Sequence, residues 1–203
     1  EISACLVGSE MCIRDSDQPM KFAYADPPYV GHAKACYGGG WKARPGKDVE
    51  HVAEVNHREL IDNLVESYPD GWALSLSSTS LHSILPMCPP DVRIMAWVKP
   101  FASFKPNVNP AYAWEPIIVR GGRKRGRTML TERDWVSIPI TLKKGLVGAK
   151  PKTFCYWLFS VLGMKKGDEL VDIFPGSGAV LTAWESYQNS GQIEIFRPAE
   201  GER

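Results

Sequence analysis

Five consecutive residues, Ala25-Asp26-Pro27-Pro28-Tyr29, place an acid, two prolines and an aromatic ring at the end of a short apolar run. Because proline lacks a backbone N–H and disfavours helix in the preceding residue, we expect a strand that ends at Asp26. The turn would present the Asp26 carboxylate beside the Pro27 carbonyl. Such a turn suits a flat ligand whose amino group donates to both acceptors while its ring stacks on Tyr29. From these residues alone, a proline turn that caps a buried strand is an equal alternative.

A second candidate site lies in residues 170–179. An apolar run with an acid at Asp172 is followed there by two glycines, Gly176 and Gly178, and a predicted helix. Glycine lets the backbone approach a ligand closely, and a helix amino terminus offers free N–H groups, so the pattern indicates a cofactor loop. The third glycine of G-x-G-x-x-G is missing, which makes a dinucleotide a poor match. The candidate cofactor-binding residues are Asp172, Phe174, Pro175, Gly176, Ser177 and Gly178.

Together, Asp26-Pro-Pro-Tyr29 and Phe174-Pro-Gly-Ser-Gly178 resemble the two motifs of the amino-group methyltransferases that use S-adenosylmethionine. In that family D-P-P-Y is the catalytic motif and F-x-G-x-G is the cofactor motif. The catalytic motif comes first in this chain, which is similar to the beta group of DNA methyltransferases. The resemblance runs from about residue 20 to residue 187 and looks closest to DNA adenine N6 methylases of phages and actinobacteria.

The resemblance implies an α/β fold with the class I, Rossmann-like methyltransferase sheet, circularly permuted so that the catalytic motif precedes the cofactor motif. It implies S-adenosylmethionine as the cofactor, and a Lys-Pro pair puts Lys150 at the border of the cofactor pocket. The family usually has a further strand whose terminal acid holds the cofactor ribose. Only residues 192–196 remain for that strand, with Glu194 as a doubtful substitute. The catalytic residues implied are Asp26, Pro27, Pro28 and Tyr29.

The implied reaction is methyl transfer to the exocyclic amine of a flipped base in DNA, with adenine N6 as the first choice. D-P-P-Y also suits cytosine N4, and the related N-P-P-Y serves RNA and protein-glutamine enzymes, so single-stranded DNA and RNA stay open as partners. A catalytically inactive, nucleic-acid-binding subunit is a second class of protein, although it would be expected to lose the acid or the glycines. A nucleotide-binding dehydrogenase would need the fuller glycine fingerprint.

Two further segments predict contacts with nucleic acid. Residues 120–127 hold five positive charges and no negative one, and their glycines leave the backbone free to follow phosphates, although a solvated loop is the usual alternative. Residues 30–56 show no clear periodicity, and a loop of this length is either functional or a plain surface loop. The candidate nucleic-acid-binding residues are Arg120, Arg123, Lys124, Arg125, Arg127 and, for stacking on a base, Trp41.

Periodicity predicts the elements that must position these residues. Apolar runs predict strands at residues 22–25, 72–77, 92–98, 116–120 and 170–172, and helical spacing predicts helices at 57–68, 80–85, 154–162 and 179–187. Pro86 is expected to stop the second of these helices. The alternation of strands and helices indicates a largely parallel sheet covered on both faces. In the class I methyltransferase sheet that the resemblance implies, ligands bind at the carboxyl ends of the strands around the switch point, where the strands ending at Asp26 and Asp172 would be neighbours.

Composition sets the class of protein. With 203 residues, 44% apolar and 23% charged, the chain fits one globular domain, expected at residues 20–190. Residues 1–19 are expected to be a non-native or disordered head and residues 191–203 a tail. Five cysteines without a C-x-x-C pair indicate reduced thiols and no metal site, as in a cytoplasmic bacterial or phage protein. No apolar run approaches the ~20 residues that cross a bilayer.

Overall fold

The computed structural model describes residues 18–28, 55–100, 108–126, 131–141 and 149–189. Within these ranges one six-stranded sheet has the order β5-β3-β4-β2-β1-β6. β1 pairs in parallel with both of its neighbours, β3 pairs in parallel with β5, and β4 runs antiparallel to β2 and β3. The sheet is therefore largely parallel, as predicted. The strands are β1 (Lys21–Ala25), β2 (Gly71–Ser75), β3 (Arg93–Val98), β4 (Trp114–Gly121), β5 (Trp135–Ser137) and β6 (Glu169–Asp172).

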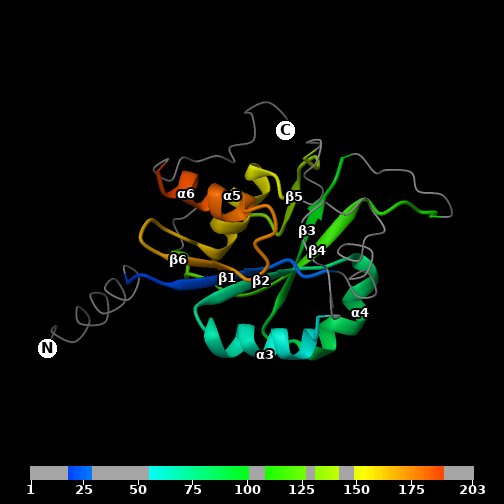
Figure 1. The fold of residues 1–203 in the computed structure, drawn as a ribbon, viewed down its shortest axis with the longest axis horizontal. Coiled ribbons are helices and arrows are strands. Elements are labelled where there is room, and N and C mark those ends of the chain that lie inside the picture. Colours follow the sequence, from blue (N-terminus) through cyan, green and yellow to red (C-terminus); the bar gives the residue numbers. More distant parts are fainter. Residues whose placement is uncertain (1–17, 29–54, 101–107, 127–130, 142–148, 190–203) are drawn as a thin grey trace, which may run out of the picture.

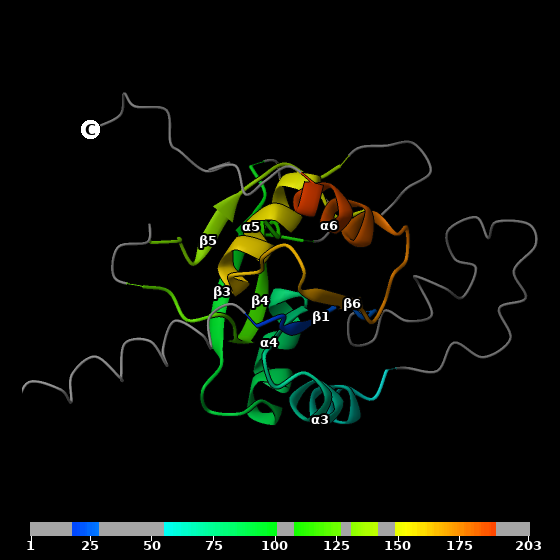
Figure 2. The ribbon, with the colours of Figure 1, turned by 90° about the vertical axis from the view of Figure 1, so that its left-hand side faces the viewer.

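Helices cover both faces of the sheet, as the sequence predicts. Figure 1 shows α5 and α6 above the sheet and α3 and α4 below it, and the turned view in Figure 2 keeps the same two layers apart. The helices are α3 (His57–Ser67), α4 (Leu81–Ile84), α5 (Lys152–Leu162) and α6 (Ala179–Asn189), with 3-10 turns η1 (Ser78–Ser80) and η2 (Leu85–Met87). None of the helices in the described ranges is long and apolar enough to span a membrane.

β1 is the buried centre of this arrangement. Phe22 and Tyr24 point into the apolar cluster on the α5 side, where they meet Phe154, whereas Ala23 and Ala25 belong to the cluster on the α3 side. All four residues are at most 1% exposed. Successive side chains of a strand point to opposite faces, so a strand covered on both faces is apolar throughout.

Two local features differ from the predictions. Pro86 does not stop the chain from coiling, because α4 ends at Ile84 and η2 continues through Pro86 in its first turn. A missing N–H is harmless in a first turn, since that group would have no partner inside the helix. β5 was not predicted, since it has only three residues, of which Val136 alone is buried. A strand that short carries no readable periodicity.

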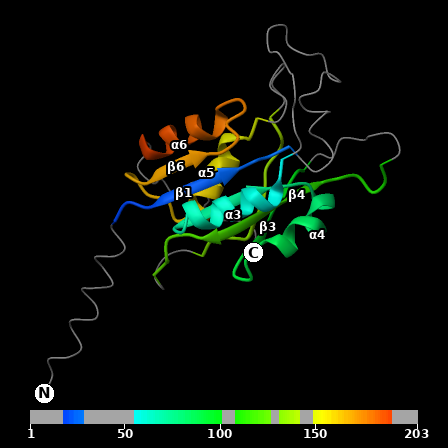
Figure 3. The same cartoon turned by 60° about the horizontal axis from the view of Figure 1, so that its bottom comes forward.

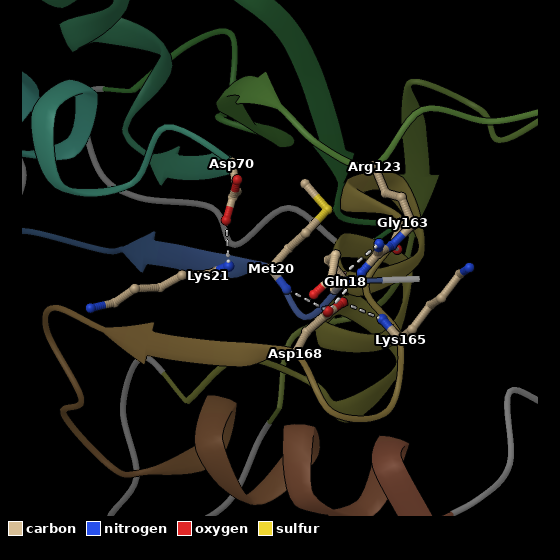
Figure 4. Close-up of polar contacts among 8 residues, drawn as sticks. All are labelled: Gln18, Met20, Lys21, Asp70, Arg123, Gly163, Lys165 and Asp168. Carbon is tan, nitrogen blue, oxygen red and sulfur yellow. Dashed lines mark hydrogen bonds and ion pairs between the residues drawn. The ribbon is translucent and has the colours of Figure 1, made fainter. Parts of the chain in front are cut away.

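A buried ion pair fastens the amino-terminal end of the sheet (Figure 4). Arg123 Nη2 lies 2.6 Å from Asp168 Oδ1, with the two side chains 7% and 2% exposed. The same carboxylate accepts from the backbone N–H groups of Met20 and Lys165, at 2.9 and 2.7 Å. Arg123 also donates to the carbonyl of Gly163. The pair therefore links the end of β4 to the start of β1 and to the connection between α5 and β6.

We predict that Arg123→Ala lowers the free energy of unfolding by about 3–5 kcal/mol, because it leaves the Asp168 carboxylate buried without its cation. Urea unfolding followed by circular dichroism measures the change. The matched control is Lys124→Ala at the exposed neighbouring position, which should stay within about 0.5 kcal/mol of the parent protein. Equal stabilities for the two variants would contradict the assignment of a structural role to this pair.

Candidate active site

Asp26 and Asp172, which were expected to be neighbours, lie at the same end of the sheet, where β1 and β6 finish. β1 ends at Ala25, directly before Asp26, and β6 ends at Asp172. The register pairs Tyr24 with Asp172, and Ile173 N–H donates to the Tyr24 carbonyl at 2.9 Å, which continues the pairing beyond β6. Asp26 therefore lies at the carboxyl end of β1 and close to the turn that follows β6.

That turn and the end of β1 line one pocket. Its walls include the glycine turn, the start of α6 and four side chains from the other elements, namely Tyr24, Asp26, Lys150 and Asp172. The residues of the turn and helix that line it are Phe174, Pro175, Gly176, Ser177, Ala179 and Val180. The pocket thus combines the predicted catalytic acid with most of the predicted cofactor residues.

The two glycines of the turn are required by its backbone. Gly176 and Gly178 have φ angles of +46° and +73°, and Gly178 N–H donates to the Pro175 carbonyl at 2.6 Å. These angles lie in the region that favours glycine. A Cβ atom on Gly178 would meet nothing within 4 Å, and one on Gly176 would meet only the Phe174 carbonyl oxygen, at 3.7 Å. The space beside the turn is therefore open to a ligand.

A line of alternating charges runs from the pocket into the sheet. Lys150 Nζ lies 3.0 Å from Asp26 Oδ1 and 3.6 Å from Glu115 Oε2. The other carboxylate oxygen of Glu115 is paired with Lys99. Lys150 lines this pocket, so its predicted place beside a cofactor stays a prediction, and its contact with Asp26 was not predicted from the sequence.

Burial dominates the electrostatics of the two acids. It raises the pKa of Asp26 above the ordinary value for an aspartate, against the opposing effect of Lys150. Burial likewise raises the pKa of Asp172 to about 6. For Lys150 burial acts to lower the pKa, but Asp26 and Glu115 together raise it above its usual range, so the ammonium stays charged. The pocket therefore holds carboxylates whose ionised forms are costly until a further cation arrives.

Sequence reasoning missed two residues of the site. The Tyr24 ring lines the pocket, and its hydroxyl lies 2.8 Å from Ser75 Oγ. Glu115 is the second residue of β4 and supports Lys150. The available signals were an alternation of aromatic residues and alanines in β1 and a single acid beside an apolar run. Neither signal gives a partner without the fold.

The predicted phosphate-binding loop lies elsewhere. β4 ends at Gly121, which pairs with Gly71, the first residue of β2. The loop therefore begins at the amino-terminal end of the parallel strands, whereas Asp26 lies at their carboxyl end. Arg120 Nε lies 2.9 Å from Asp91 Oδ1, and Arg125 contacts the Ser160 carbonyl as well as Glu132. Arg123 belongs to the buried pair described above. Phosphate contact by this loop stays a prediction, with exposed Lys124 as its clearest candidate.

Several predicted residues lie outside the described ranges. They are Tyr29, Trp41, Arg127 and Glu194. Within the described ranges, no group of three or more histidine, cysteine or acidic residues could hold a metal ion, and Cys88 and Cys155 are free thiols.

We predict that Asp172→Asn stabilises the ligand-free protein above pH 6. The folded-state pKa is raised from 3.8 to about 6, so the folded state holds the proton more tightly than the unfolded chain. The contribution of Asp172 to the free energy of unfolding must therefore fall as pH rises from about 4 to 6, and the loss persists above that range. Allowing for partial exposure, Asn should recover about 1 kcal/mol at pH 8 and nothing at pH 4. Urea titrations at both values test this, and a gain that does not depend on pH would contradict it.

Comparison with solved structures bears on the fold. A crystal structure of M1.HpyAVI matches with a TM-score of 0.50 and 12% identity over 88% of this chain and 82% of that chain. The crystal structure of the M1.HpyAVI–SAM complex matches with a TM-score of 0.47 and 15% identity over 90% and 86%. No family model and no curated protein matches the sequence. The likeness with a TM-score of 0.50 supports the predicted Rossmann-like α/β fold, while the permuted order of motifs stays a prediction.

Proposed function

We propose that this protein transfers a methyl group from S-adenosylmethionine to the exocyclic amine of a nucleic-acid base, with adenine N6 in DNA as the first candidate. The observation that carries the proposal is that the Asp26 carboxylate and the glycine turn after β6 line the same pocket. The Asp26 carboxylate is an acceptor that matches an amine, and the open space beside Gly176 matches a cofactor. M1.HpyAVI has been solved in complex with SAM, but its likeness to this chain concerns the fold alone.

The charge of the pocket supports this cofactor. S-adenosylmethionine carries a sulfonium and an ammonium group, and it supplies an electrophilic methyl group. Asp172 is a carboxylate whose pKa burial raises to about 6, and a nearby cation would stabilise its ionised form. The open space beside Gly176 and Gly178 can take atoms that a side chain would displace. Asp172 and residues 174–178 would therefore hold the cofactor.

The residues at the end of β1 would prepare the nucleophile. The amine of adenine is a poor nucleophile because its lone pair is delocalised into the ring. Hydrogen bonds from its two N–H groups to Asp26 and to the Pro27 carbonyl favour a pyramidal nitrogen and free the lone pair. The nitrogen would become positive as its bond to the methyl carbon formed and the carbon–sulfur bond of the sulfonium broke, which leaves S-adenosylhomocysteine, and the Asp26 carboxylate would stabilise that charge. The extra proton would then pass from the nitrogen to solvent.

The base must reach this turn from outside a duplex. An amine stacked inside double-stranded DNA cannot approach the end of β1, so the nucleotide must be flipped out or single-stranded already. Tyr29 would supply the stacking face. We propose a short recognition context, since the described parts of residues 108–137 hold β4 and β5 but no helix that could lie in a major groove. Methylation of a random-context DNA library, read by sequencing, tests this, and a requirement for four or more fixed base pairs would contradict it.

Nucleoside mass spectrometry of DNA and RNA incubated with protein and S-adenosylmethionine tests the reaction itself. We expect N6-methyladenine in DNA. Methylation mainly of cytosine, or of RNA alone, would keep the chemistry and overturn the choice of substrate. Absence of any methylated nucleoside in both nucleic acids would overturn the proposed function.

We predict that Asp26→Ala lowers the rate of methyl transfer by ~100-fold or more, because it removes one of two oriented acceptors for the amine. The melting temperature should show that the variant is folded. Asp62→Ala, which changes an exposed acid on α3, is the matched control and should keep the parent rate. Near-parent turnover by the Asp26 variant would mean that the catalytic acid lies elsewhere.

We predict that S-adenosylmethionine raises the melting temperature of the parent protein, since a ligand bound only by the folded state stabilises it. Gly176→Val should remove this shift by filling the cofactor space. Gly167→Val is the matched control, because Gly167 also has a positive φ angle and open surroundings but lies outside the pocket. The control should melt lower than the parent and still respond to the cofactor. A shift retained in Gly176→Val would place the cofactor elsewhere.

A further inference from the structure

The Lys150 ammonium is enclosed on several sides at the back of the pocket. Its side chain is 7% exposed and contacts Asp26 and Glu115. Two aromatic rings complete its surroundings, with Nζ 5.4 Å from the ring centroid of Trp97 and 6.0 Å from that of Phe154. A buried cation needs such partners, and the negative faces of aromatic rings add to them. Lys150 therefore has little freedom to turn toward a bound cofactor.

The supports of Lys150 are themselves held in place. Glu115 pairs with Lys99, whose Nζ lies 4.9 Å from the centroid of the same Trp97 ring. The Trp97 indole N–H donates to the Ile138 carbonyl at 2.8 Å, which fixes that ring. Glu115, Trp97 and Lys99 lie on paired strands β3 and β4 or directly after them. The array thus extends from Asp26 into the rigid part of the sheet.

We propose that Lys150 and Glu115 are positioning residues for Asp26, in which Lys150 holds one carboxylate oxygen so that the other faces the substrate amine, and Glu115 holds Lys150. The inference deepens the proposed function and rests on it for its consequence in catalysis. It differs from the role that the sequence predicts for Lys150, which is contact with the cofactor.

The groups around Asp26 determine the sign of the effect. Lys150 and Lys99 are positive, Glu115 and Asp172 are negative, and the buried Cys155 thiol, whose pKa burial raises to about 12, is neutral at working pH. Removing Lys150 leaves Asp26 facing two carboxylates with only the more distant Lys99 as a cation. The pKa of Asp26 must then rise further, and the acidic limb of a rate profile must move to higher pH.

The test compares Lys150→Met with Lys152→Met, which changes an exposed lysine two residues further along, at the start of α5. Titration of carbon-13-labelled aspartate by NMR, with the Asp26 signal assigned through Asp26→Asn, should show Asp26 titrating at higher pH in Lys150→Met and unchanged in Lys152→Met. Methyl transfer by Lys150→Met should fall by roughly 100-fold. Binding of S-adenosylmethionine, measured by calorimetry, should change less than about 3-fold.

The opposite pattern, with weaker cofactor binding and an unchanged Asp26 titration, would overturn the proposal and return Lys150 to the cofactor. The NMR titration needs no turnover, so a parent protein without methyl-transfer activity would contradict the proposed function while the link between Lys150 and Asp26 is still tested.

Glu115→Gln keeps the inference falsifiable if Lys150→Met fails to fold. If Glu115 acted through its charge alone, the Glu115→Gln variant would keep the parent rate or its acidic limb would move to lower pH. If Glu115 positions Lys150, the rate of the variant should be lower at every pH by about 10-fold. A parent-like rate at high pH would overturn the role of Glu115.

Discussion

The parallel pairing of β1 with β6 is the constraint on which the site depends. These are the first and last strands of the described chain, and their register places Tyr24 opposite Asp172. Parallel neighbours end at the same edge of a sheet, so the turn after each strand opens on the same space. A slip of one residue would turn every side chain of β1 to the other face of the sheet. Figure 3 shows β1 between β6 and the remaining strands, with α3 in front of it.

Contacts at both ends keep this register in place. At the amino-terminal edge Glu169 N–H donates to the Met20 carbonyl, and Asp168 binds Met20 N–H while it pairs with Arg123. At the carboxyl edge Ile173 N–H donates to the Tyr24 carbonyl. The buried ion pair therefore acts on the site from the far end of the same strands. A site supported by rigid strands holds its geometry better than one carried by loops alone.

The sequence predicted those parts of the molecule that local patterns encode. The strands that carry Asp26 and Asp172, the glycine turn and the four helices follow from apolar periodicity and from proline and glycine chemistry. The prediction that Asp26 and Asp172 are neighbours came from the sheet that the family resemblance implies, and the pairing of β1 with β6 agrees with it. β5 was not predicted because three residues are too few to show a periodic pattern. Glu115 was not predicted because its role depends on Lys150, which follows it 35 residues later, beyond β5 and residues that lie outside the described ranges.

The basic loop shows the limit of reading charge from composition. Five positive residues in eight predict a solvated or phosphate-binding segment, yet Arg123 is largely buried against Asp168 and Arg120 pairs with Asp91. Both acids are remote in sequence, so no local window balances the charge. Only the fold decides whether a run of cationic residues faces solvent or pairs with acids of the same chain. Here Arg120 and Arg123 are paired, so much of the run has a structural role.

The two ends of the sheet use buried charge in different ways. Around Asp168, one carboxylate meets an arginine and two backbone N–H groups, so the acceptor is satisfied within the chain. Around the pocket, Asp26 and Asp172 both have raised pKa values, because burial outweighs the help they receive from Lys150. A fold selected only for stability would neutralise or expose these acids. Their retention in an open, glycine-walled pocket is expected where a cationic ligand completes the set of charges. The proposed cofactor would also account for the inward turn of Lys150 to Asp26, since a lysine reaching into the pocket would repel a cationic ligand.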